Sequence, residues 1–124
     1  MKTTETLKQL AAAGVIAAAL GTAPAVPAGT LGGHESHEDR VLASDTDTYS
    51  LWFTGDELAG VVVIGDGDTD LDLRVYDESG NLVASDTDWT DFCVVFWTPG
   101  RSGTFRIEIE NLGDVYNAYI LAVN

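Results

Sequence analysis

The stretch DLDLRVYDESGNLVASD (residues 70–86) alternates apolar and polar side chains on both sides of a turn. Leu71, Leu73 and Val75 fall on one face of an extended chain, because successive side chains of a strand point to opposite sides. The turn lies at residues 78–81 (ESGN), since glycine and asparagine accept the positive φ that tight turns need. The sequence therefore predicts a β-hairpin with one buried face.

The same pattern recurs along most of the chain. Apolar or alternating runs are separated by turn signals, and no sustained helical period occurs after residue 30. Strands that each have one apolar face must bury that face against a second sheet. We therefore expect an all-β protein, an antiparallel two-sheet β-sandwich that is jelly-roll-like, with about seven to eight short strands. The remaining runs cover residues 48–54, 58–65, 92–98, 104–111 and 118–124.

Residues 1–28 predict a secretory signal peptide. An uninterrupted apolar run, Leu10 to Leu20, follows a lysine-containing start, and small residues mark cleavage after Ala28 or Ala25. The run is shorter than the roughly 20 residues that span a bilayer, which favours cleavage over a membrane anchor. We therefore expect a secreted protein with a flexible acidic lead-in at residues 29–43 and a folded domain at residues 44–124.

The charge balance narrows the choice of partners. The chain has 20 acidic residues against 6 lysines and arginines, which gives a net charge of −14. Nucleic acids and anionic membrane surfaces are disfavoured as partners, because both are bound through Lys and Arg. Two interpretations remain: binding of divalent cations, or a surface adapted to a salt-rich (halophilic) setting in which salt screens self-repulsion.

Residues 65–111, followed by NAYILAVN (117–124), resemble the bacterial and archaeal pre-peptidase C-terminal (PPC) domain. The shared features are an acidic strand of the form D-x-D-L-x-V-Y-D, a glycine hairpin, an apolar strand that ends in Thr-Pro-Gly, and a terminal aromatic strand. The resemblance implies a non-catalytic β-sandwich that accompanies a secreted peptidase. Related modules in bacterial collagenases bind collagen and chelate calcium, so it also implies a fibrous protein as partner and Ca²⁺ as ligand.

Two groups of acidic residues are candidates for calcium binding. Asp66, Asp68 and Asp70 have the spacing of the first EF-hand ligands, but Leu71 stands where that loop needs glycine. A row of carboxylates around Ca²⁺ remains an alternative to a solvated strand face at this stretch. The resemblance to the collagenase modules implies a second location, where an acidic N-terminal segment meets acids that precede a strand: Glu35, Glu38, Asp39, Asp45 and Asp47.

The sequence contains no catalytic constellation. His34 and His37 are three positions apart, whereas the zinc-protease motif needs two histidines four apart on a helix. The nucleophile motif G-x-S-x-G is also absent. We therefore expect a protein that is not an enzyme. The single cysteine, Cys93, lies among apolar residues and is expected to be a buried, inert thiol.

Exposed aromatic residues suggest a second candidate function. Trp89 stands in the polar loop SDTDWTD (85–91), where an indole can stack on a sugar or grip a peptide. Tyr76 and Tyr119 extend that surface if they lie on the outer face of a sheet. The alternative is that Trp89 folds back over the hairpin. The first hypothesis is thus a stabilising or binding module with calcium, and the second is a module that binds a polysaccharide or fibrous protein.

Overall fold

The computed structural model describes residues 35–124. The predicted signal peptide (1–28) and the first part of the predicted lead-in (29–34) lie outside the described residues. Within the described part of the chain, no helix is long and apolar enough to cross a membrane. The strands are β2 (Glu35–Val41), β3 (Thr46–Phe53), β4 (Ala59–Ile64), β5 (Leu71–Tyr76), β6 (Leu82–Asp86), β7 (Phe92–Trp97), β8 (Gly103–Asn111) and β9 (Asn117–Val123).

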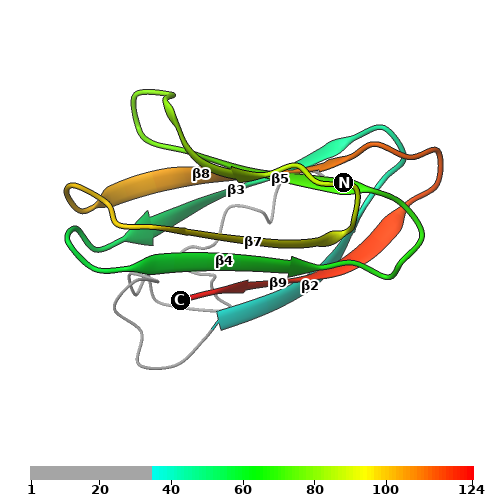
Figure 1. Ribbon diagram of the computed structural model, residues 1–124, viewed down its shortest axis with the longest axis horizontal. Coiled ribbons are helices and arrows are strands. Elements are labelled where there is room, and N and C mark those ends of the chain that lie inside the picture. Colours follow the sequence, from blue (N-terminus) through cyan, green and yellow to red (C-terminus); the bar gives the residue numbers. More distant parts are fainter. Residues whose placement is uncertain (1–34) are drawn as a thin grey trace.

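These strands form two antiparallel four-stranded sheets that lie face to face (Figure 1). One sheet has the order β2-β9-β4-β7, and the other has the order β3-β8-β5-β6. Neighbours in space are mostly distant in sequence, which is the order of an eight-stranded jelly roll. The predicted all-β, two-sheet antiparallel sandwich and its jelly-roll character are confirmed.

Alternating side chains of both sheets fill the space between them. Leu71, Leu73 and Val75, the predicted apolar row of the hairpin, have no exposed surface. At the other end of the core, the ring of Phe53 makes edge contacts with Trp97 and Phe105, at centroid distances of 4.9 and 5.8 Å. Burial of such side chains supplies the main driving force for folding.

The predicted flexible lead-in was wrong for residues 35–41. They form the edge strand β2, which pairs with β9 along its whole length, for example Glu38 with Ile120. Only Val41 gives this strand an apolar signal, so alternation could not reveal it. Backbone hydrogen bonds to β9 and the burial of Val41 hold it in place.

The antiparallel order gathers the loops at the two ends of the sandwich. The loops at 42–45, 65–70, 87–91 and 112–116 meet at one end, on the right in Figure 1. The loops at 54–58, 77–81 and 98–102 lie at the opposite end, near the C-terminus. We name the first group the acidic end, because its loops contain Asp45, Asp66, Asp68, Asp70, Asp88, Asp91 and Asp114.

Candidate functional site

The acidic end brings together residues that the sequence assigns to two separate calcium sites. Asp66, Asp68 and Asp70 lie in the β4–β5 loop, and Asp45 lies in the β2–β3 loop of the same end. Trp89 stands in the β6–β7 loop beside them. One concentrated region of negative charge therefore surrounds the most exposed aromatic residue of the described chain.

Asn117 holds the loops of this end together. Its side chain is fully buried at the start of β9. The amide nitrogen donates to the Thr69 carbonyl oxygen, to Thr69 Oγ1 and to Asp91 Oδ2, at 3.3, 3.1 and 3.0 Å. The amide oxygen accepts the backbone N–H of Asp66 at 3.0 Å. One side chain thus fixes both the β4–β5 and the β6–β7 loop, because a buried amide keeps all its hydrogen bonds.

Asn111 does the same for the other two loops. It is 1% exposed at the end of β8, and its amide nitrogen donates to the carbonyl oxygens of Val41, Leu42 and Val115. Its amide oxygen accepts the backbone N–H of Gly113 at 2.9 Å. Sequence reasoning missed both asparagines. Their only signal was an asparagine directly beside an alternating strand run, a position where asparagine commonly satisfies loop backbone groups.

Of the first predicted calcium group, Asp66 is engaged in hydrogen bonds to the backbone, whereas Asp68 is exposed. Asp66 Oδ1 accepts the N–H of Asp68 at 3.0 Å, and Asp66 Oδ2 accepts the N–H of Ala118 at 2.8 Å. Asp70 is half-buried, and its Oδ1 has no hydrogen-bond partner. Burial, with repulsion from Asp88 and Asp91, raises the pKa of Asp70. This stretch is therefore a folded turn in which the charged form of one carboxylate, Asp70, is disfavoured. Its oxygens are not arranged as the ligands of an ion.

The second predicted group is dispersed. Asp47 is fully buried and accepts the hydroxyl of Tyr119 at 2.6 Å. Asp45 Oδ1 accepts the N–H of Thr46, and Asp39, on β2, accepts the N–H of Arg40. Glu38 is exposed on that strand, and the side chain of Glu35 lies outside the described residues.

The positions of these carboxylates determine whether they could hold Ca²⁺. Among the described residues, no three His, Cys, Asp or Glu side chains are grouped so that they could hold one metal ion. A Ca²⁺ site takes six to eight oxygen ligands, and the predicted ligands do not fit that requirement as they stand. Calcium binding stays a prediction from the sequence.

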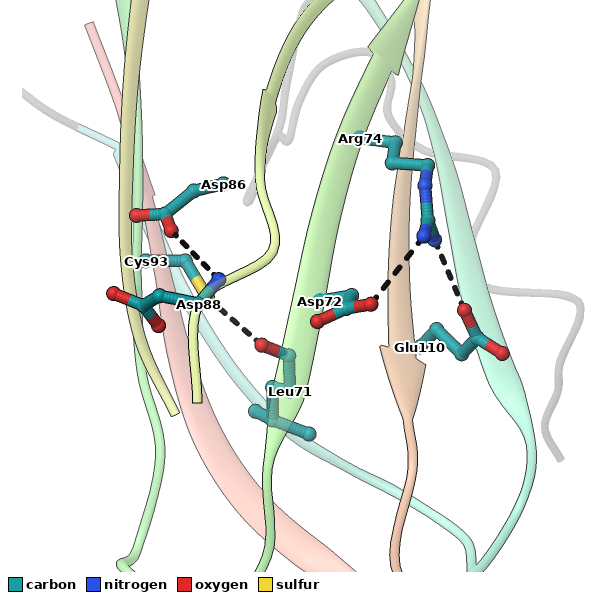
Figure 2. A network of polar contacts seen from close by, with 7 residues as sticks. All are labelled: Leu71, Asp72, Arg74, Asp86, Asp88, Cys93 and Glu110. Carbon is teal, nitrogen blue, oxygen red and sulfur yellow. Dashed lines mark hydrogen bonds and ion pairs between the residues drawn. The ribbon is translucent and has the colours of Figure 1, made fainter. Parts of the chain in front are cut away.

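Trp89 is 91% exposed, so it does not fold back over the hairpin. Short hydrogen bonds hold its loop: Asp88 Oδ1 accepts both the N–H and the hydroxyl of Thr90 at 2.9 Å. Asp86 in turn accepts the N–H of Asp88 (Figure 2). The indole therefore projects into solvent from an ordered turn, where its apolar surface is free for contact with another molecule.

The two tyrosines do not extend this surface. Tyr119 is 2% exposed and faces the core, where its hydroxyl lies 2.6 Å from that of Tyr49. Burial raises its pKa well above the ordinary value. The condition for a role at the surface is thus not met by Tyr119, because Ile120 takes the outer face of β9. Tyr76 is half-buried at the opposite end of β5, under the Arg106 guanidinium at 4.3 Å.

The outer face of β5 and β8 carries an ion-pair network in place of a ligand site. Figure 2 shows Arg74 between Asp72 and Glu110, with nitrogen–oxygen distances of 3.3 and 2.9 Å. On the inner side, the Cys93 thiol donates to the Leu71 carbonyl oxygen at 3.2 Å (Figure 2). Cys93 is fully buried, and burial raises its pKa to about 12. The predicted burial of this thiol is confirmed, and its inertness stays a prediction.

A cleft of about 450 Å³ lies at the end opposite the acidic end. It is lined by the loops around residues 77–79 and 98–104, together with Trp97 and Phe105. Glu78 crosses part of it to accept the N–H of Thr104 at 3.1 Å. None of the predicted metal-binding residues or Trp89 lines this cleft.

The fold is similar to those of two proteins of known structure. No protein-family model and no curated protein matches the sequence. The structure is similar to the pre-peptidase C-terminal domain of a collagenase from Bacillus anthracis, with a TM-score of 0.63 and 14% identity over 72% of this chain and 87% of that chain. It is also similar to a periplasmic inhibitor of g-type lysozyme from Aeromonas hydrophila, with a TM-score of 0.55 and 15% identity over 73% of this chain and 84% of that chain. At such low identity the likeness shows the fold, and residues 35–124 have the β-sandwich fold of a pre-peptidase C-terminal domain.

Proposed function

We propose that this protein is an exported, non-catalytic binding module, extracellular or periplasmic, which recognises its partner with the acidic end of the sandwich. The observation that carries the proposal is Trp89, which is 91% exposed on a hydrogen-bonded turn. An indole in that position adds nothing to the core, and tryptophan is among the residues that most often dominate binding energy.

The surrounding charge favours a partner with a cationic surface. Asp66, Asp68, Asp88 and Asp91 lie in the two loops that Asn117 joins, so their charges are held in fixed positions. A fixed acidic region attracts a cationic partner over a Debye length and speeds its association. Trp89 then supplies short-range apolar contact from the β6–β7 loop of the same end.

The structural neighbours are compatible with a protein partner. One of them is a lysozyme inhibitor and the other is a domain of a collagenase, so this fold occurs in proteins that bind or accompany other proteins. A fibrous protein or a secreted peptidase is therefore the first class of partner to test.

A polysaccharide is the second candidate. The favouring observation is that Trp89 is flanked by Asp88 and Thr90, polar groups that can accept hydrogen bonds from sugar hydroxyls while the ring stacks on the indole. Binding of an uncharged sugar responds weakly to salt, whereas attraction between an acidic end and a cationic protein weakens steeply as salt rises. The salt dependence of the binding affinity therefore distinguishes a cationic protein partner from a polysaccharide.

The test is a binding assay of the full chain with three probes: collagen, a g-type lysozyme and insoluble chitin. We expect one probe to be bound with an affinity that Trp89→Ala reduces at least about tenfold. Trp52→Ala is the matched control, because Trp52 is 43% exposed on the outer face of β3, away from the acidic end. Binding of none of the probes, or equal loss with both variants, would contradict the proposal.

Calcium enters the proposal as a stabiliser of the acidic end. Its support is the concentration of aspartates there, and the positions of Asp66 and Asp47, with their oxygens in hydrogen bonds, count against it. A rise of the melting temperature with Ca²⁺ that saturates and is absent with Mg²⁺ would establish it, since a ligand stabilises the state it binds. If NaCl alone has the same effect, calcium binding is wrong.

A further inference from the structure

The outer face of the β9-β4-β7 sheet is apolar. On each of these strands the residues that alternate with the core face outward, and the four largest are Phe96 at 63%, Phe92 at 53%, Ile64 at 45% and Ile120 at 39% exposure. Register places Phe92, Ile64 and Ile120 side by side, because Ile64 pairs with both of the others, and Phe96 lies farther along β7, opposite Gly60. Val62, Val94 and Ala122 lie between them on the same face, and Ala118 lies beyond Ile120 on β9. We name this set the outer apolar face.

The absence of charge on this face is unusual for such an acidic protein. The protein has 20 acidic residues, yet β4, β7 and β9 contain no charged residue at all. The outer face of the opposite sheet has the reverse character, with Asp72, Arg74, Arg106, Glu108 and Glu110. One outer face of the sandwich is thus charged and the other is apolar. Because large exposed apolar patches commonly mark interaction surfaces, the apolar face is a candidate for contact with a partner.

The β7 edge of this sheet is obstructed against strand addition. On one side β2 covers β9 and presents Ser36, Glu38 and Arg40 outward as a polar border. On the other side Asp86 accepts the N–H of Val94 at 3.0 Å, which occupies a donor that an added strand would need. A partner that contacts β7 is therefore expected to lie on the face and not to extend the sheet at that edge.

The size of the face fits a small dimer interface. With about 200 Å² for a fully exposed phenylalanine and slightly less for isoleucine, the four large side chains alone present roughly 350 Å². Specific interfaces bury about 600–1,000 Å² on each partner, and about 500 Å² is the least expected of a biological one. The smaller residues of the face and the polar border of β2 supply the remainder, so a second sandwich can cover the face without any other element.

We propose that the outer apolar face binds the same face of a second copy of this chain. The face is apolar across its width: β7 presents Phe92, Val94 and Phe96, and β9 presents Ala118, Ile120 and Ala122. A two-fold axis along β4, in the plane between two copies, lays β7 of one copy over β9 of the other. Because Phe92 and Ile120 share one level of the sheet, Phe92 of each copy then meets Ile120 of the other, and Val94 meets Ala122.

This dimer goes beyond the proposed function and leaves the acidic end accessible in both copies. The same axis brings the two acidic ends to one side of the dimer, where they repel each other. Salt screens that repulsion and strengthens apolar association, so the dimer is expected to tighten with salt, opposite to the binding of a cationic partner.

The test is sedimentation equilibrium of the full chain over a concentration series in about 0.1 M and about 1 M NaCl, where the screening length falls from about 10 to about 3 Å. We expect a monomer–dimer equilibrium that is tighter in the higher salt. The double variant Ile64→Thr with Phe96→Thr is expected to weaken dimerisation at least tenfold. The matched control, Leu82→Thr with Trp52→Thr, removes exposed apolar side chains from the other sheet and is expected to leave dimerisation unchanged.

Phe96 also covers Gly60, with a ring carbon 2.9 Å from where a glycine Cβ would lie, so its replacement can loosen the strand pair. Ile120→Thr is therefore a second variant, on β9, that leaves Gly60 covered. The proposal is overturned if the wild-type chain is a monomer at every concentration in both salts. It is also overturned if folded Ile120→Thr and the double variant dimerise as tightly as the control.

Discussion

Replacement of Asn117 by alanine tests whether one buried amide holds the acidic end together. The variant Asn117→Ala removes three donated hydrogen bonds, to Thr69 and Asp91, and one accepted from Asp66. At about 1 kcal/mol for each bond, and with water able to reach some of the freed loop groups, the loss of stability is roughly 3 kcal/mol. For a domain of this size, that corresponds to a fall in melting temperature of about 12–24 °C.

The assay is thermal unfolding followed by circular dichroism, with urea unfolding as a second measure of the free energy of unfolding. Asn81→Ala is the control: its side chain is exposed at the opposite end and makes one bond, to Asp77 at 3.2 Å. We expect the control to change stability by less than about 0.5 kcal/mol. If Asn117→Ala melts within about 4 °C of the wild type, the loops are held by other contacts and the reasoning is refuted.

Four further results are expected. Asp70→Asn should raise the melting temperature at about pH 7, because burial and repulsion from Asp88 and Asp91 raise the pKa of Asp70 above its ordinary value of 3.8. The gain should vanish at about pH 3, where Asp70 is protonated in both states, and a gain that is independent of pH would contradict this cause. The Cys93 thiol should resist a thiol reagent in the native protein and react after unfolding, since it is fully buried with its pKa raised to about 12; rapid native labelling would show that the strand pair opens. Phe53→Ala should cost about 3–5 kcal/mol in urea unfolding, because a fully buried ring leaves a cavity, and a cost under 1 kcal/mol would mean that the core collapses around it. Trp89→Ala should leave the melting temperature within about 2 °C of the wild type, because the side chain is 91% exposed; a large fall would give Trp89 a structural role.

The alternation of apolar and polar residues along the sequence was sufficient to predict most of the strands. Each predicted run corresponds to a strand from β3 to β9, because residues such as Leu73 and Ile107 alternate with polar neighbours over several positions. The strand β2 was missed for a physical reason. It is an edge strand with polar side chains on its outer face and only Val41 fully buried, and its stability comes from pairing with β9, which lies far along the sequence.

The candidate site was only partly predictable. The acidic loops and Trp89 stand out locally, so the sequence indicated both. Their gathering at one end depends on the jelly-roll order, which no local pattern encodes. Tyr119 illustrates the limit: it falls within a correctly predicted strand, but which face of that strand is buried was decided by the partner strands. The same ambiguity hid the outer apolar face, since a run such as FCVVFW (92–97) does not show which side meets solvent.

The most direct test of the proposed function is the affinity of the full chain for a g-type lysozyme, measured by isothermal titration calorimetry for the wild type, Trp89→Ala and Trp52→Ala in low and high salt. We expect the wild type to bind, Trp89→Ala to bind at least about tenfold more weakly, and Trp52→Ala to match the wild type. The affinity should also fall as salt rises, because the acidic end attracts its partner electrostatically. Binding that is unaffected by Trp89→Ala and by salt would contradict recognition through the acidic end. If lysozyme is not bound, the proposal for a cationic protein of this class fails, and collagen and chitin remain the probes that decide whether the acidic end binds any partner.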